Sequence, residues 1–160
     1  MILTAHQQPS PLGDKISRIK SLVIAATAAI ALASCGTMPS TYSIDNSRTY
    51  NRSYDEVWER LVQFFASRNI PIKNIAKDSG VIYAESMSFN NDAADCGTGG
   101  LWTPFGRKAS FNVFVTRSTD RPSVSVNTEF QEMRRFDRRT ETVTCNSKGV
   151  IENAVLDALN

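Results

Sequence analysis

Apolar residues recur at helical spacing in two segments of the chain, and each segment predicts an amphipathic helix. The first helix begins at the S-x-x-E capping box formed by Ser53 and Glu56. It ends before Pro71, because the residue that precedes a proline avoids helical backbone angles. The apolar stripe of this helix consists of Val57, Leu61, Val62 and Phe65. The second helix starts near Asn146 or Ser147, and its stripe consists of Ile151, Ala154, Val155, Ala158 and Leu159.

Between the helices, and once before them, apolar and polar residues alternate in the manner of strands. Asp78-Ser79-Gly80 supplies the turn of one hairpin, because it combines a polar turn residue with a position that accepts positive φ. The element order is β-α-β-β-β-β-β-α, with the first strand the least distinct. This order predicts an α+β fold in which an antiparallel sheet of four to five strands carries two helices on one face. The predicted strands are 41–44, 70–76, 81–85, 109–115, 124–130 and 141–145.

Two stretches lack periodicity, and they are the candidate interaction surface. Residues 86–108 predict a long loop, and loops of this length in a small domain are usually functional or held in place. Its aromatic residues are either lids of the core or anchors for a partner. Residues 133–139 carry four arginines around Phe136. Arginine forks suit phosphate and carboxylate, so this segment could meet lipid phosphates, lipopolysaccharide or an acidic protein surface, and a solvated hairpin tip is the alternative. The candidate residues are Trp102, Phe105, Arg134, Arg135, Arg138 and Arg139.

The most apolar run of the chain, residues 22–33, lies near the N-terminus and is interrupted only by Thr27. It is too short for a transmembrane helix, which needs roughly 20 apolar residues. A run of this length that follows basic residues is typical of the h-region of a secretory signal. A buried helix is the alternative, but the abrupt polar turn after the run disfavours it. The basic residues are Lys15, Arg18 and Lys20.

The stretch Leu32-Ala33-Ser34-Cys35 closes this run and resembles the lipobox of bacterial lipoprotein precursors. The resemblance implies cleavage before Cys35, attachment of diacylglyceryl to its sulfur, and acylation of the new amino group with palmitate-type chains. It also implies sorting to the outer membrane, because Gly36 rather than an aspartate follows the cysteine. Two or three acyl chains are sufficient for a stable anchor, at about 0.8 kcal/mol per buried CH₂.

The lipobox sets the expected organisation of the chain. We expect a signal peptide at 1–34, a lipidated tether at 35–50 and a single α+β domain at 51–160. The mature protein would then face the periplasm from the outer membrane. The net charge of +2 belongs to the leader, because 15 basic and 15 acidic residues cancel from residue 35 onward. A neutral domain has no bulk electrostatic reason to bind nucleic acid, and we expect none as a partner.

Export also predicts the state of the other two cysteines. Cys96 and Cys145 form an even pair in an exported chain, which is most simply a disulfide. Closing a loop of roughly 50 residues contributes on the order of 4 kcal/mol in the chain-entropy model.

Catalytic chemistry has few candidates in the mature chain. The only histidine, His6, lies in the leader, so nucleophile schemes that use histidine are excluded. Asp92 and Asp95 remain as carboxylates for glycosidase-like chemistry on peptidoglycan or glycan, which is the alternative function. They could also offer oxygens to Ca²⁺, but the spacing of an EF-hand is absent. We predict a protein that is not an enzyme and that uses no cofactor or metal.

From Ser53 onward the chain is similar to the small domains of outer-membrane lipoproteins, such as the lipoprotein C subunit of the β-barrel assembly machinery. The likeness consists of the polar helix cap, the pair Val57-Trp58, and the hairpin turn that contains Asp78 and Gly80. It implies a scaffold or interaction role, with no catalytic residues to carry over. We therefore expect a non-catalytic envelope lipoprotein that binds an envelope protein or polymer. A structural filler without a specific ligand is a further alternative.

Overall fold

Two 14-residue antiparallel strands, β5 (Thr103–Thr116) and β6 (Ser123–Phe136), form the centre of the domain. The computed structural model describes residues 36–86, 88–118 and 121–160. The sheet has seven strands in the order β2-β3-β5-β6-β7-β4, and β1 pairs with β6 outside this path. The other elements are β1 (Ser47–Thr49), α2 (Tyr54–Ser67), β2 (Ile72–Ala76), β3 (Val81–Ser86), β4 (Ala94–Asp95), β7 (Arg139–Ser147) and α3 (Val150–Asp157).

The α+β class is confirmed, but the strand count was too low. The sheet contains seven strands rather than four to five. The short strand β4 was missed, because two residues carry no readable alternation. The first strand lies at Ser47–Thr49 instead of 41–44.

Helix α2 begins and ends where the sequence predicted. The hydroxyl of Ser53 accepts a hydrogen bond from the backbone N–H of Glu56 (3.2 Å), and the Glu56 carboxylate accepts one from the backbone N–H of Ser53 (2.9 Å). This reciprocal capping box satisfies two of the N–H groups that a helix start leaves unpaired. The helix ends at Ser67, four residues before Pro71.

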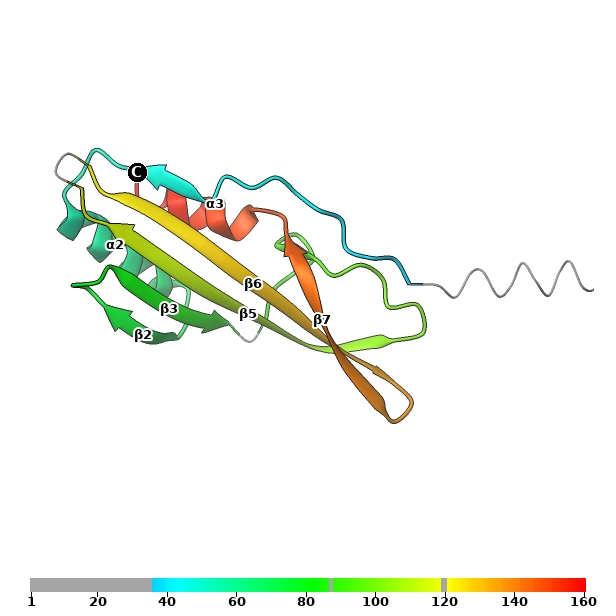
Figure 1. Cartoon of the computed structure of the whole chain (residues 1–160). Coiled ribbons are helices and arrows are strands. Elements are labelled where there is room, and N and C mark those ends of the chain that lie inside the picture. The colour runs from blue at the N-terminus through cyan, green and yellow to red at the C-terminus, as the bar shows by residue number, and fades with distance from the viewer. Residues whose placement is uncertain (1–35, 87, 119–120) are drawn as a thin grey trace, which may run out of the picture. The chain divides into compact units, whose positions relative to one another are not determined.

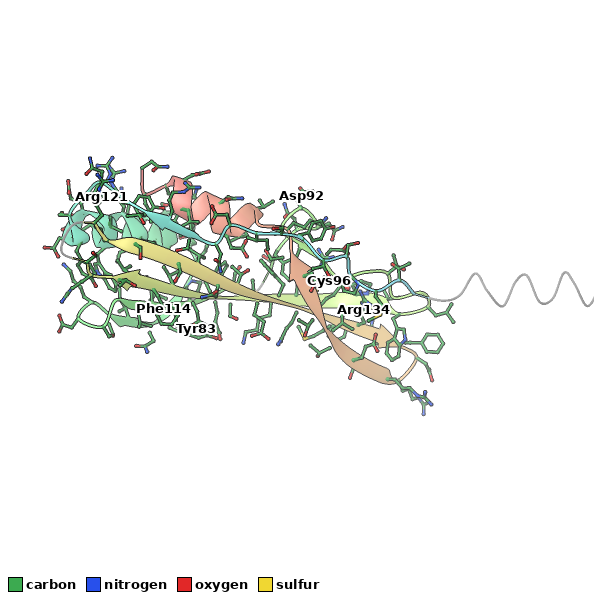
Figure 2. All side chains as sticks on the ribbon, turned by 45° about the horizontal axis from the view of Figure 1, so that its top comes forward. Tyr83, Asp92, Cys96, Phe114, Arg121 and Arg134 are labelled. Carbon is green, nitrogen blue, oxygen red and sulfur yellow. A yellow bond between two sulfur atoms is a disulfide. The ribbon has the colours of Figure 1, made fainter. Side chains whose placement is uncertain are left out.

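The core lies between one face of the sheet and both helices, and Figure 1 shows α2 and α3 on the same side of it. Phe65 of α2 packs edge-on against Phe111 of β5, with ring centroids 6.0 Å apart. The hydroxyl of Tyr50 donates to the carbonyl of Leu156 near the end of α3 (2.7 Å), and burial raises the pKa of Tyr50 to about 12. The opposite face is open: Figure 2 shows Tyr83 and Phe114 there, and Phe114 is 43% exposed.

At the end of the sheet that the helices do not cover, strands β5, β6 and β7 extend past the predicted limits. β5 starts at Thr103 instead of 109, β6 continues to Phe136 instead of 130, and β7 starts at Arg139 instead of 141. The cause is that the residues on the core side of the strands change from apolar to charged. Arg107, for example, lies opposite Glu132 in the β5–β6 pairing. Charged residues at inward positions interrupt the apolar alternation while the backbone pairing continues, so the predicted loop 86–108 is shorter than expected.

Helix α3 begins at Val150, three to four residues later than predicted. The polar residues in front of it serve β7 and a buried carboxylate instead. Glu152 is 3% exposed and accepts hydrogen bonds from the hydroxyls of Ser147 and Thr128.

Residues 36–160 form one compact unit, which includes most of the stretch that we expected to be a tether. The chain from Gly36 to β1 runs along the domain, as the cyan segment of Figure 1 shows. The expected signal peptide at 1–34 and the expected lipid attachment at Cys35 lie outside the described residues. Within the described ranges, no helix has the length and apolar character needed to cross a membrane.

Candidate interaction site at the disulfide-bonded end

A disulfide joins the loop after β4 to strand β7. Cys96 and Cys145 have their sulfurs 2.06 Å apart, and both residues are buried. This is the pair that the sequence predicted. The bridge acts together with the β4–β7 pairing, in which Ala94 lies opposite Ser147. The loop between β3 and β5 is therefore held on the core side of the sheet.

Three charged side chains lie between this loop and the long strands. The carboxylate of Glu132, 3% exposed, accepts a 2.7 Å bond from Nε of Arg134. Its other oxygen accepts bonds from Nε (2.9 Å) and Nη2 (2.7 Å) of Arg107. We expected Arg134 at the interaction surface, but its side chain is only 6% exposed, and Figure 2 shows it close to Cys96. Arg134 is therefore part of the interior.

The two guanidinium groups connect the carboxylate to the backbone of the loop. Arg134 Nη2 donates to the carbonyl oxygens of Cys96 (2.6 Å) and Gly97 (3.3 Å). Arg107 Nη1 donates to the carbonyl of Phe89 (3.2 Å). A buried ion group of this kind contributes little net stability, but it requires one specific arrangement of its partners. We call these three charged residues the arginine clamp, because they fix the loop to β5 and β6.

Asp95 holds the segment that enters the domain. One carboxylate oxygen accepts the backbone N–H of Ser40 (3.0 Å) and the hydroxyl of Tyr42 (3.3 Å), and the other accepts the N–H of Gly97 (2.8 Å). Hydrogen bonds from the Gly97 and Ser40 N–H groups lower the pKa of Asp95, because they stabilise the charged carboxylate. Asp95 is therefore an ionised attachment point for the entering segment.

The first residues of this segment pair with the disulfide loop. The N–H of Thr37 donates to the hydroxyl of Thr98 (2.9 Å), and the N–H of Thr98 donates to the carbonyl of Thr37 (3.0 Å). Gly97 has a positive φ of 65°, and a Cβ there would lie 2.1 Å from the carbonyl oxygen of Thr37. Only glycine allows the two chains to approach so closely.

The two aspartates considered for catalysis serve different partners. Asp92 accepts a hydrogen bond from the side-chain amide of Asn90 (3.4 Å) and lies in the turn before β4. Asp95 is bound to the entering segment, as described above. Both interactions are structural in kind. No group of three or more His, Cys, Asp or Glu side chains that could hold a metal ion occurs in the described part of the chain.

The end of the sheet beyond the arginine clamp exposes aromatic and basic side chains. Trp102 is half-buried against Phe136, with ring centroids 5.9 Å apart. Phe105 is 53% exposed, and the guanidinium of Arg135 lies 5.9 Å from the centre of its ring. Figure 1 shows this end extending past both helices. We call it the tip, and define it as Leu101, Trp102, Phe105, Arg135, Phe136, Arg138 and Arg139.

The structure therefore brings together five of the six surface residues that the sequence predicted, all except Arg134. Sequence reasoning missed Leu101, which is 65% exposed. It noted Phe136, which is 42% exposed, as the one phenylalanine among the four arginines but did not select it as a contact residue. A comparison with known proteins finds no matching family model and no matching curated protein.

Proposed function

We propose that this chain is a membrane-anchored envelope lipoprotein whose folded domain is a non-catalytic binding or scaffold module. The observation that carries the proposal is the lipobox Leu32-Ala33-Ser34-Cys35 at the end of a short apolar run. The bridge between Cys96 and Cys145 supports it, because disulfides persist mainly in exported proteins. We place the anchored protein on the outer membrane, facing the periplasm, because Gly36 follows the cysteine.

The polar groups of the disulfide-bonded end support a binding role over catalysis. Arg107, Glu132 and Arg134 form hydrogen bonds with one another and with loop carbonyls. Asp95 holds the entering segment and is ionised through its lowered pKa, which does not suit a general acid. The exposed surface of the domain, such as the open face of the sheet, then remains for an envelope protein or polymer to bind. The likeness of the first helix and hairpin to small lipoprotein domains supports the same role.

Substitution of the proposed anchor tests the lipoprotein assignment. The full chain with its leader is expressed in a Gram-negative host, and a Cys35→Ala variant is compared with it. We expect the parent to lose residues 1–34 and to incorporate labelled palmitate, and the variant to remain a full-length, unlabelled precursor. Intact-mass spectrometry of the membrane fraction reads out both changes.

The double variant Cys96→Ser/Cys145→Ser is the matched control, because it removes two thiols but leaves the lipobox. It should be cleaved and labelled like the parent. Normal cleavage and labelling of Cys35→Ala would contradict the proposal. The enzymatic alternative is tested separately: release of soluble fragments from purified peptidoglycan by the parent, but not by Asp92→Asn/Asp95→Asn, would replace the binding role.

A further inference from the structure

The entering segment leaves no free length between residue 36 and the folded domain. The N–H of Thr98 donates to the carbonyl of Thr37, and the N–H of Thr37 donates to the hydroxyl of Thr98. A Cβ placed on Gly36 would lie 2.3 Å from the carbonyl oxygen of Thr98, so this residue also touches the disulfide loop. The loop is in turn fixed by the bridge at Cys96. The chain is therefore in contact with the domain up to the residue that follows the proposed anchor.

Covalent geometry then limits how far the domain can stand from the membrane. Consecutive Cα atoms are about 3.8 Å apart, so Cys35 lies one such step from Gly36. A free tether of about 15 residues would instead have a root-mean-square length of roughly 20 Å. If Cys35 carries the lipid, the surface around Gly36 must lie at the headgroup layer.

The surface around Gly36 is continuous with the tip. The Cβ position of Gly36 lies 3.3 Å from the carbonyl carbon of Gly99, and the carbonyl of Gly99 accepts the N–H of Trp102 (3.0 Å). Trp102 packs against Phe136, which ends β6. A short series of contacts thus connects the proposed anchor position with the aromatic side chains of the tip.

Exposed apolar side chains are concentrated at this end of the domain. Eight large hydrophobic side chains are exposed in the described residues, and four of them belong to this end. Met38 in the entering segment is 89% exposed and Leu101 is 65% exposed. Clusters of this kind mark interaction sites, since isolated exposed residues are the norm elsewhere on protein surfaces. The four residues are Met38, Leu101, Phe105 and Phe136.

The charges of the tip complement an anionic lipid surface. Arg135, Arg138 and Arg139 are exposed around the turn of the β6–β7 hairpin, with Asp137 as the acidic residue of that turn. Arginine and aromatic side chains together suit the interface of a membrane, where the ring is partly buried and the cation meets phosphate. A bilayer surface with anionic headgroups attracts basic side chains that lie close to it.

We propose that the tip is a membrane-docking surface that lies on the phospholipid headgroups of the bilayer that holds the anchor. This inference rests on the lipid anchor of the proposed function. The disulfide and the arginine clamp keep the tip rigid, so docking sets the orientation of the whole domain. Figure 2 shows Arg121 at the end opposite Arg134, and that end therefore points away from the membrane. The open sheet face and this far end stay accessible to a partner.

Tryptophan fluorescence tests the docking directly, because the described residues contain one tryptophan in the tip and one in the core. The full acylated protein with Trp58→Phe keeps Trp102 as its reporter, and the matched variant Trp102→Phe keeps Trp58, which is only 5% exposed. Both are placed in vesicles of zwitterionic and anionic phospholipid that carry a nitroxide near the headgroup. We expect the nitroxide to quench the fluorescence of Trp102 several-fold more strongly than that of Trp58. In the vesicle-bound protein, the fluorescence of Trp102 should also be protected from quenching by aqueous iodide.

Exposed residues of the tip provide a second test that does not depend on Trp58→Phe folding. In the otherwise unchanged acylated protein, Leu101→Ser/Phe105→Ser should lose most of the lipid quenching, whereas Phe114→Ser on the open sheet face should retain it. Weaker quenching in purely zwitterionic vesicles would support the role of the arginines.

The outcomes separate the two proposals. A chain that is not acylated and does not associate with vesicles would refute the anchor itself. A chain that is acylated and associated, but whose Trp102 is quenched no more than Trp58, would refute the docking surface alone. Equal quenching in the parent and in Leu101→Ser/Phe105→Ser would also refute it.

Discussion

The two ends of the same long strands are stabilised in different ways. Under the helices, the inward positions of β5 and β6 hold apolar residues such as Phe111 and Val126. Further along the same face, the inward positions hold Arg107, Glu132 and Arg134. The helix-covered end is thus stabilised by apolar burial, at about 25 cal/mol per Å². The disulfide-bonded end is stabilised by a covalent bridge and a buried ion group.

This difference indicates what each end is for. Apolar burial contributes stability, whereas a saturated ion group contributes a specific geometry and little net stability. A loop that buries few apolar side chains would open locally without a covalent constraint. The bridge between Cys96 and Cys145 supplies that constraint, so the tip keeps one shape without a core of its own.

The largest expected effect is at the helix-covered end. Phe65 is fully buried against Phe111, and Phe65→Ala removes that packing. We expect a loss of about 3–5 kcal/mol in the free energy of unfolding, measured by urea denaturation of the 36–160 segment. Phe114→Ala on the open face is the matched control, with an expected change within about 1 kcal/mol. Similar losses in the two variants would mean that the helices do not define the core.

Removal of the disulfide should have the next largest effect, and a local one. Cys96→Ser/Cys145→Ser should lower the free energy of unfolding by about 2–4 kcal/mol, because the unfolded chain gains entropy. Hydrogen exchange should show faster exchange in the loop from Phe89 to Trp102, with α2 still protected. Loss of protection in α2 at the same rate would show that the two ends unfold as one unit and would remove the distinction between them.

A smaller effect is expected in the arginine clamp. Glu132→Gln keeps the shape of the side chain but leaves Arg134 without its charged partner in a buried site. We expect a loss of about 2 kcal/mol, measured by urea denaturation. Glu129→Gln, at an exposed position of the same strand, should change the free energy of unfolding by less than about 0.5 kcal/mol. Equal effects at the two positions would show that the clamp is not a distinct stabilising element.

The same comparison explains which parts of the fold could be predicted from the sequence. Where apolar residues alternate under the helices, as in 109–115 and 124–130, the predicted strands lie inside β5 and β6. The capping box at Ser53 located the start of α2 because it is a local interaction. The bridge between Cys96 and Cys145 was predicted on the expectation of export, which assigns Cys35 to the lipid and leaves these two cysteines as a pair.

The disulfide-bonded end was predicted less well, because its inward positions are charged. Arg134 resembled a surface residue, and only its long-range contacts with Glu132 and the carbonyl of Cys96 show that it is buried. The attachment of the entering segment was also missed. It depends on hydrogen bonds between residues more than 50 positions apart, such as those between Ser40 and Asp95, and no local pattern records them.

The attachment of the entering segment provides the smallest and most local test. Its reporters are the amide resonances of Ser40 and Gly97, whose N–H groups donate to Asp95. The pKa of this carboxyl is lowered below its ordinary value of 3.8, so the attachment is complete above that value and is lost as the pH falls through the folded pKa. Both resonances should therefore titrate together below pH 3.8. In Asp95→Asn they should be independent of pH in this range, and Ser40 should be partly detached because the amide has one acceptor oxygen instead of two. A titration at or above the ordinary value would mean that these contacts do not lower the pKa of Asp95 and that the segment is held by its other hydrogen bonds, from Thr98 to Thr37 and from Asn146 to Ser40.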